Sequence, residues 1–315
     1  MTRKLATILC VILLLTALGC GEQSHTVDNS EPIVSVVDSL GNTVTLSTSP
    51  RNTAVLFSSF AEIWQLAGGR VGITVGESVE RGFVSDGTPL VDEGAGKSIN
   101  LELLLSYKPD LVIGSADIPA HKEACELLSK AGIPVLLFVL EDFSDYLFVL
   151  EAMTDVTGRK DLFDEYGSEL KKEVDAILQG EAAANWHGKR ILFVRAGTSA
   201  SGTKAKRAKD HFACAMLQEL GCLNIADNAP VLLDGLNMEA ILTYDPEYIF
   251  FSLMGNEDGA TRNVNSLLES DAWQALTAVK QGRVVILPRE LFHFKPNARW
   301  AMAYSYLVRL GDDSP

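Results

Sequence analysis

Positive charge gathers in one short segment of an otherwise acidic chain. The 315 residues carry a formal net charge of −14 at pH 7, yet residues 195–211 read RAGTSASGTKAKRAKDH. Guanidinium, ammonium and imidazole groups bind carboxylates, catecholates, propionates and phosphates through charge-assisted hydrogen bonds. The segment therefore predicts a site for an anionic ligand, and a solvated loop of ordinary lysines is the alternative. Its candidate ligand-binding residues are Arg195, Lys204, Lys206, Arg207 and His211.

A second candidate cluster lies near the C-terminus, where residues 291–299 read LFHFKPNAR. Aromatic rings suit a large planar or macrocyclic ligand, and the imidazole of His293 could coordinate iron or cobalt. Phe292, His293 and Arg299 are therefore candidate ligand-binding residues, and His293 is also the candidate metal ligand. The alternative is that the phenylalanines belong to the core and that His293 is a hydrogen-bonded structural residue.

The elements that must position these residues alternate between helices and short apolar strands. The strands are continuously apolar, which is typical of a parallel sheet covered by helices on both faces. We therefore expect an α/β fold with two Rossmann-like lobes, mainly parallel sheets and a cleft between the lobes. After a hairpin over 33–46, the expected strands are 54–57, 71–75, 111–114 and 135–139 in the first lobe and 190–194, 248–252 and 284–287 in the second.

Parallel α/β sheets bind ligands beyond the carboxyl ends of their strands. In the first lobe this edge follows residues 54–57 and 135–139, so Ser59, Phe60 and Phe143 are candidate ligand-binding residues. In the second lobe the corresponding edge begins at Arg195, directly after the expected strand over residues 190–194.

The sequence predicts a helix start and a long loop near this edge of the first lobe. Ser58 or Ser59 suits the N-cap of a helix over residues 61–67. The glycine-rich, charged residues 76–97 predict a long loop.

One motif occurs once in each half of the chain. NLELLLSYKPDLVI begins at Asn100 and NMEAILTYDPEYIF begins at Asn237, an offset of 237 − 100 = 137 residues. Each copy reads as a helix, a proline break and a buried strand, with Asn100 as N-cap of the first. A repeated unit predicts two similar lobes. Glu102 and Glu239 are matched, and the helix dipole alone stabilises a carboxylate in a first turn by about 0.3–1 kcal/mol.

Three segments divide the chain after residue 32. Residues 33–157 form the expected N-terminal lobe, 158–186 a connecting helix and 187–315 the C-terminal lobe. Residues 160–183 have helical spacing and few helix-breaking residues. At 1.5 Å per residue, about 24 residues span roughly 36 Å. One stiff helical connector predicts small lobe movements on ligand binding.

The N-terminus carries an export signal. Residues 1–19 combine a basic start with an apolar stretch too short for a comfortable membrane span. The residues before Cys20 resemble a bacterial lipobox, which implies cleavage before Cys20, lipidation of its sulfur and a lipidated tether over residues 20–32. Attachment to the membrane is then expected through this lipid anchor alone. An ordinary signal peptide with a chance cysteine is the alternative.

Several function classes are excluded by composition and spacing. The acidic charge argues against nucleic acid as a partner. The GAGKS of residues 94–98 lacks the first glycine of a phosphate-binding loop, because position 91 is Val91. Five histidines are too scattered for a multi-histidine zinc or manganese site. Cys125, Cys214 and Cys222 match no zinc spacing and are expected to be buried thiols, with a Cys214–Cys222 disulfide as the alternative.

The ordered set VVDSLGNTVTL, VLFSSFAEIWQLAGG, NLELLLSYKPDLVIG and FHFKPNARWAMAYSYL resembles the substrate-binding proteins of ABC importers for iron complexes, haem and cobalamin. The resemblance covers nearly all of residues 33–310. It implies a monomeric, extracytoplasmic binding protein at the periplasmic or cell-surface face of the membrane, without enzymatic activity or intrinsic cofactor.

The resemblance also implies a ligand and a partner. The ligand is an iron complex, either a ferric siderophore or haem, with a corrinoid such as cobalamin as the alternative and a chelatase-like enzyme as a less favoured one. The partner is an ABC permease dimer with its ATPase. In this family one glutamate on each lobe docks onto permease arginines, and the residues that match are Glu102 and Glu239.

Overall fold

The computed structural model describes residues 34–92 and 98–312. The predicted signal peptide, the lipidation site Cys20 and the tether lie outside the described residues. The described chain begins with the predicted hairpin, in which β1 (Val34–Val37) and β2 (Thr43–Leu46) pair antiparallel.

The first sheet has four parallel strands in the order β4-β3-β5-β6. Alternate residues of one strand serve opposite faces: Val55 belongs to the core shared with α2 and α6, whereas Ala54 belongs to the core shared with α4 and α5. Both faces are buried, which explains the continuous apolar runs. The elements are β3 (Thr53–Val55), β4 (Val71–Ile73), β5 (Leu111–Ser115), β6 (Val135–Phe138), α2 (Ser58–Leu66), α4 (Leu101–Ser106), α5 (Pro119–Lys130) and α6 (Phe143–Thr157).

The second sheet repeats this order, with β10 between β11 and β7 and with β9 parallel to β7 on its other side. The short strand β8 pairs antiparallel with the end of β7, so the sheet is mainly parallel. The elements are β7 (Arg190–Ala196), β8 (Lys204–Ala205), β9 (Leu223–Asn224), β10 (Tyr248–Leu253), β11 (Val284–Ile286), α9 (Phe212–Glu219), α10 (Met238–Tyr244), α11 (Glu257–Leu268), α12 (Asp271–Gln274), α13 (Thr277–Lys280), α14 (Arg289–Phe292) and α15 (Trp300–Asp312). The predicted α/β fold is confirmed.

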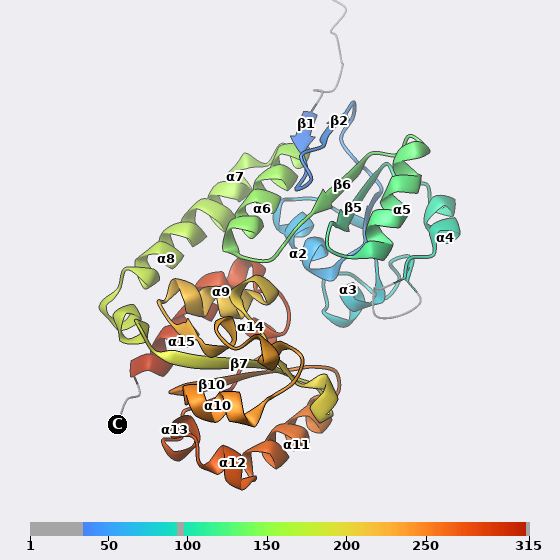
Figure 1. Cartoon of the computed structure of the whole chain (residues 1–315). Helices are drawn as coiled ribbons and strands as arrows, with labels where there is room; N and C mark the ends of the chain where they lie inside the picture. Colours follow the sequence, from blue (N-terminus) through green and yellow to red (C-terminus); the bar gives the residue numbers. More distant parts are fainter. Residues whose placement is uncertain (1–33, 93–97, 313–315) are drawn as a thin grey trace, which may run out of the picture. The chain divides into compact units, whose positions relative to one another are not determined.

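The connector between the sheets differs from the single α-helix that we expected. Figure 1 shows the chain crossing between the lobes through α7 (Lys160–Phe163) and α8 (Glu169–Leu178). A π-helical turn, Asp164–Ser168, joins them, and its Gly167 lies so close to the ring of Phe163 that a Cβ would be 2.9 Å from it. The α-helix ends at Leu178, before Gly180, and a 3₁₀ segment follows.

The two copies of the repeated motif build the same junction. In the first copy, the side-chain amide of Asn52 donates to the carbonyls of Tyr107 and Lys108, at 2.8 and 3.2 Å. In the second copy, Arg190 Nε donates to the carbonyls of Tyr244 and Asp245, at 3.2 and 3.4 Å. These two residues lie 137 positions after Tyr107 and Lys108. Lys108 and Asp245 both have positive φ, 52° and 40°, so even the backbone bend before the proline is repeated.

Two details of the first lobe also differ from expectation. Helix α2 begins at Ser58 with Phe57 as N-cap and no side-chain cap, because both serine hydroxyls accept from Arg81 Nη1 instead. Within the predicted loop over residues 76–97, α3 (Gly76–Glu80) forms a short helix. Asn100, in contrast, caps α4 as predicted, accepting from the N–H of Leu103 at 3.0 Å.

No helix within the described residues is both long and apolar enough to cross a membrane.

Candidate functional site

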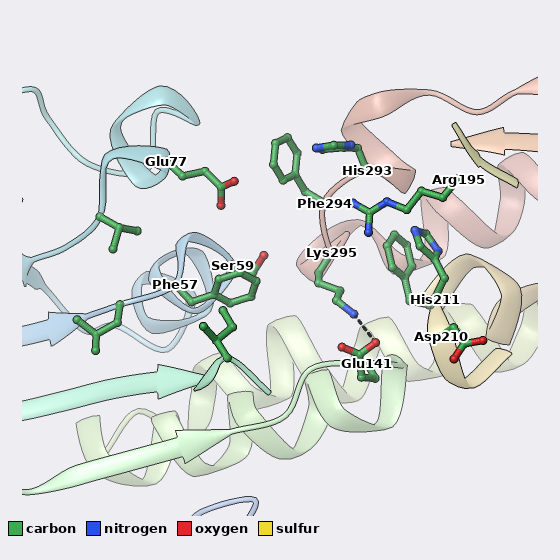
Figure 2. A pocket seen from close by; sticks show the side chains of 14 residues that line it. Phe57, Ser59, Glu77, Glu141, Arg195, Asp210, His211, His293, Phe294 and Lys295 are labelled. Atoms are coloured by element: carbon green, nitrogen blue, oxygen red, sulfur yellow. Dashed lines mark ion pairs between the residues drawn. The ribbon is translucent and has the colours of Figure 1, made fainter. Parts of the chain in front are cut away.

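Residues of both lobes line a cavity of about 360 Å³ (Figure 2). This volume is at the lower end of the range of about 300–1,000 Å³ that is usual for ligand pockets. The lining residues follow the carboxyl ends of the parallel strands, where the sequence placed the site. The first lobe contributes Leu56, Phe57, Ser59, Val75, Glu77, Ile118 and Glu141, and the second contributes Arg195, Asp210, His211, Phe212, His293, Phe294 and Lys295.

Arg195 is the residue through which β7 reaches the cavity. Figure 2 shows its guanidinium pointing inward. Burial lowers the pKa of Arg195, and the nearby carboxylate of Glu141 opposes that shift. Its Nε is buried without a hydrogen-bond partner, and within the described part of the chain it forms no ion pair. An arginine remains charged even when buried, so the cavity contains a cation without an ion-pair partner among the described residues.

Lys295 is the second cation of the cavity, and the opposite lobe provides its partner. Its Nζ lies 3.1 Å from Glu141 Oε2, and the Lys295 side chain is only 14% exposed, against 49% for Glu141. Burial lowers the pKa of Lys295, whereas Glu141 acts in the opposite direction. The ammonium also lies 5.2 Å from the ring centroid of Phe212. The ion pair therefore spans the cavity from one lobe to the other.

His293 presents a hydrogen-bond acceptor to the cavity. Its Nδ1 lies 2.8 Å from the carbonyl oxygen of Leu253, and because a carbonyl only accepts, that nitrogen carries the proton. Burial lowers the pKa of His293, which favours the neutral ring. The lone pair of Nε2 is then available to a donor or a metal centre.

His211 has the opposite tautomer. Its Nδ1 accepts from the backbone N–H of Ala213 at 3.1 Å, as the N-cap of α9, so Nε2 carries the proton. Burial first, then the positive charges of Arg195 and Lys295, holds its pKa well below the ordinary value near 6.5. The ring stacks on Phe212 with 4.7 Å between centroids. Two neutral histidines thus offer one N–H donor and one lone pair.

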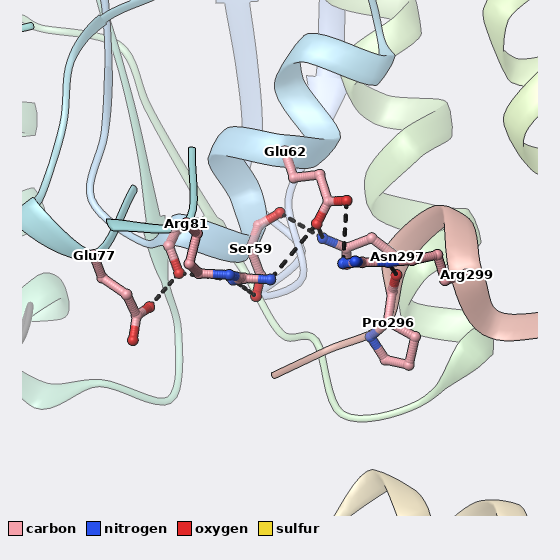
Figure 3. Close-up of polar contacts among 8 residues, drawn as sticks. Ser59, Glu62, Glu77, Arg81, Pro296, Asn297 and Arg299 are labelled. Atoms are coloured by element: carbon pink, nitrogen blue, oxygen red, sulfur yellow. Dashed lines mark hydrogen bonds and ion pairs between the residues drawn. The ribbon is translucent and has the colours of Figure 1, made fainter. Parts of the chain in front are cut away.

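Beside the cavity, a buried polar cluster joins the lobes (Figure 3). Asn297 Nδ2 donates to the carbonyl of Ser59 at 3.0 Å and to Glu62 Oε2 at 2.7 Å. The carboxylate of Glu62 also lies 3.7 Å from Arg81 Nη2 and 3.5 Å from Arg299 Nη2. Burial raises the pKa of Glu62, and Asn297 and the two arginines oppose that effect.

The rings around Arg81 extend this cluster to the cavity wall. Its guanidinium lies 4.5 Å from the ring centroid of Phe83 and 4.3 Å from that of Phe294, which also lines the cavity. The segment that carries His293 and Lys295 is therefore fixed to the first lobe through Phe294 and Asn297.

Four of the predicted ligand-binding residues line the cavity: Ser59, Arg195, His211 and His293. The three predicted phenylalanines do not. Phe60, Phe143 and Phe292 belong to the core, where Phe143 packs against Trp300 and Phe292 against Tyr306. For Phe292 this is the core alternative given above, whereas Phe294 of the same segment lines the cavity.

The remaining predicted ligand-binding residues also lie outside the cavity lining. Arg207 pairs with Asp210 at 2.9 Å, and Arg299 pairs with Glu62 in the cluster between the lobes. Lys204 lies in β8, and Lys206 follows it. Glu141 and Lys295 lie in segments at the carboxyl ends of strands, but sequence reasoning did not select them as ligand-binding residues, because no local pattern indicates their pairing across two lobes.

Glu102 and Glu239 occupy equivalent places at the surface. Each lies in the first turn of a short helix, α4 or α10, whose N-cap is an asparagine. Both side chains are exposed and, within the described residues, neither forms an ion pair. One turn later in each copy comes an exposed leucine, Leu105 or Leu242.

The three described cysteines, Cys125, Cys214 and Cys222, are free and buried, so the alternative of a Cys214–Cys222 disulfide is not what the structure shows. Among the described residues, no group of three or more His, Cys, Asp or Glu side chains is arranged to hold a metal ion.

Comparison with known proteins assigns this architecture to a family. A family model for periplasmic binding proteins matches residues 54–291. The uncharacterized ABC transporter substrate-binding lipoprotein YvrC of Bacillus subtilis is 23% identical over 295 residues, covering 90% of this chain and 89% of YvrC.

Two solved structures from Vibrio cholerae have a similar fold. The periplasmic catecholate-siderophore binding protein VctP has a TM-score of 0.66 at 17% identity, covering 90% of this chain and 100% of VctP. The periplasmic vitamin B12 binding protein BtuF also has a TM-score of 0.66, at 18% identity, covering 84% of this chain and 97% of BtuF.

Proposed function

The chain belongs to the periplasmic binding protein family, and from this premise we propose that it captures an anionic iron complex outside the cytoplasm and delivers it to an ABC permease. It is a substrate-binding protein and not an enzyme. The proposed ligand is a ferric siderophore, or haem bound through its propionates. The lobes of residues 33–157 and 187–315 would hold it between them in a monomer.

The observation that carries this proposal is the charge of Arg195, which has no ion-pair partner among the described residues and whose Nε is buried without a hydrogen-bond partner. A partly buried guanidinium without an ion-pair partner is unfavourable in the free protein and becomes favourable when an anion binds to it. Lys295 and the N–H of His211 add two further donors on the same wall. Carboxylates, catecholates and propionates have the oxygens that such donors bind.

The tryptophans provide a direct test by fluorescence. Trp300 is fully buried, and its ring lies 5.7 Å from that of Phe212, which lines the cavity. A ferric tris-catecholate, haemin and cyanocobalamin would each be titrated into the purified protein while tryptophan emission is followed. Saturable quenching by the tris-catecholate or haemin is expected. Quenching by none of the three would overturn the proposal.

A corrinoid is the second candidate, and His293 is the observation that favours it. The Nε2 lone pair could take an axial position on cobalt, as it could on haem iron. Substitution His293→Gln would then abolish the shift in the absorption bands of bound cyanocobalamin or haemin. We rank the iron complexes first because their carboxylate, catecholate or propionate oxygens suit the two cations of the cavity, Arg195 and Lys295.

Delivery requires a permease, and we propose that Glu102 and Glu239 contact it. Their matched exposed positions on the two lobes suit a dimeric permease that presents one basic site to each lobe. In the double variant Glu102→Lys/Glu239→Lys, uptake by cells should be lost while the ligand affinity of the purified protein stays unchanged. Normal uptake by this variant would exclude the proposed contact.

We also propose that Cys20 carries the lipid anchor that keeps the protein at the extracytoplasmic face. The lipobox-like residues before it support this, as does the name of YvrC as a lipoprotein. Substitution Cys20→Ser should release the protein from membranes. Retention of the variant in the membrane fraction would contradict a lipid anchor at this cysteine.

A further inference from the structure

The ion pair between Glu141 and Lys295 differs from the other contacts between the lobes. It lies in the wall of the ligand cavity, and Figure 2 shows both side chains facing the same space as Arg195. The Nζ–Oε2 distance is 3.1 Å, so the pair is fully formed in this structure. An anionic ligand in the cavity would therefore meet one cation that is unpaired and one that already has a carboxylate.

The cluster around Glu62 shows what a permanent contact between the lobes looks like in this protein. Glu62 and Arg81 have side chains that are 16% and 9% exposed, and Asn297 donates a hydrogen bond to the same carboxylate. Glu141, in contrast, is 49% exposed, and its only described ion-pair partner is Lys295. Moving the Glu141 side chain back into solvent breaks one contact, whereas moving Glu62 would break several.

We propose that Glu141 is an internal competitor for the anionic ligand and thereby a specificity-determining residue. In the free protein its carboxylate neutralises Lys295, and on binding an anionic group of the ligand replaces it. The inference rests on the proposed function, since it assumes that the cavity binds an anionic complex.

The replacement of Glu141 by an anionic group of the ligand determines which ligands bind well. A ligand with several anionic oxygens can contact Arg195 and Lys295 together and so offset the loss of the Glu141 contact. A neutral ligand cannot, because displacing Glu141 would leave Lys295 buried without a partner. Glu141 thus stays paired with Lys295 when a neutral chelate binds and is displaced only by anionic ones, whose affinity it lowers so that the complex can still be released.

Substitution Glu141→Gln tests this directly, with Glu151→Gln as the matched control. Glu151 is exposed on α6 of the same lobe and does not line the cavity. Both variants would be titrated with a trianionic ferric tris-catecholate and with a neutral ferric trihydroxamate, and thermal unfolding would verify their folding. A partly exposed ion pair corresponds to up to about a fivefold change in affinity. Glu141→Gln should bind the tris-catecholate about three- to fivefold more tightly, and Glu151→Gln should match the wild type.

A Lys295→Gln background separates competition from simple repulsion. There the gain from Glu141→Gln should shrink, because the two residues act through one contact. An equal gain in that background, an equal gain for the neutral probe, or no gain at all would overturn the inference while leaving the proposed function intact. Failure of both wild type and variant to bind the tris-catecholate, haemin and cyanocobalamin would overturn the proposed function and this inference with it.

Discussion

The two walls of the cavity come from similar lobes yet have opposite chemistry. The second-lobe wall contains Arg195, Lys295 and two histidines, whereas the first-lobe wall is apolar except for Ser59, Glu77 and Glu141. The base of each lobe, in contrast, is built alike, down to the backbone carbonyls of the repeated motif that accept from a side chain, Asn52 in one lobe and Arg190 in the other. Duplicated architecture thus positions two equivalent strand edges, and the residues at those edges make one wall rich in cationic side chains and the other mostly apolar.

The largest effect should come from removing Arg195, the cation of the second-lobe wall that has no ion-pair partner among the described residues. Arg195→Gln eliminates the guanidinium that we expect to contact the anionic ligand. A hydrogen bond to a charged group is worth about 1.5–3 kcal/mol, so affinity for a ferric tris-catecholate should fall by about 10- to 100-fold. Fluorescence titration measures the loss.

Lys209→Gln is the matched control for that change. It removes a positive charge from the same basic segment, but Lys209 is exposed and does not line the cavity. Its affinity should stay within about twofold of the wild type, since exposed charges interact weakly. Equal losses in the two variants would mean that the whole basic segment attracts the ligand, and the distinction between the walls would then lose its basis.

The next effect concerns the contact that holds the walls together. Asn297 has a φ of 51° and donates to Ser59 and to the carboxylate of Glu62. Asn297→Ala loses both hydrogen bonds and places an alanine in the left-handed region. The free energy of unfolding should fall by about 3 kcal/mol, as measured by urea denaturation.

Asn297→Gly divides that loss into its parts. Glycine accepts the positive φ without strain but makes no side-chain hydrogen bond, so the glycine variant should be more stable than the alanine variant by about 1 kcal/mol. If Asn297→Ala unfolds like the wild type, the cluster around Glu62 does not contribute to joining the lobes.

A smaller effect should appear in the pH dependence of stability, to which the second-lobe wall contributes through its two histidines. His211 and His293 have lowered pKa values in the folded protein, so below about pH 6.5 the unfolded chain binds protons that the folded one does not. Stability should therefore be full above pH 6.5 and decrease as the pH falls, by up to about 1.4 kcal/mol per pH unit for each histidine. Urea denaturation at pH 7 and at lower pH measures this slope.

His211→Asn should reduce the slope while keeping the helix cap, because an asparagine Oδ1 can accept from Ala213. An unchanged slope would mean that His211 titrates in the folded protein as it does in the unfolded chain.

Much of the architecture was predictable because parallel strands leave a strong signal. Continuous apolar runs indicated both sheets, and the Asn-x-Glu repeat indicated two similar lobes. The connector was harder to predict, since the π-helical turn depends on Gly167 packing against Phe163, a contact that helical spacing does not reveal. The N-cap at Phe57 was missed because Arg81, distant in sequence, engages Ser58 and Ser59.

The cavity was only partly predictable, for a related reason. Arg195 and Ser59 follow strands directly, so the strand-edge rule located them. The strand-edge rule also selected Phe60 and Phe143, but both side chains pack into the core. A shift of one position along a helix decides whether a side chain faces the cavity or the core. Glu141 and Lys295 become a pair only when the lobes are placed together.

The smallest effect should come from the first-lobe wall. Ser59 lines the cavity, but its hydroxyl already accepts from Arg81 Nη1 at 3.2 Å, and its backbone carbonyl accepts from Asn297. Ser59→Ala removes only the hydroxyl, and Arg81 keeps Ser58 at 2.9 Å. Affinity for the tris-catecholate should therefore change by less than about threefold, within the range of one neutral hydrogen bond. A loss as large as that of Arg195→Gln would show that the first-lobe wall also binds the ligand through polar contacts, and the contrast between the two walls would no longer hold.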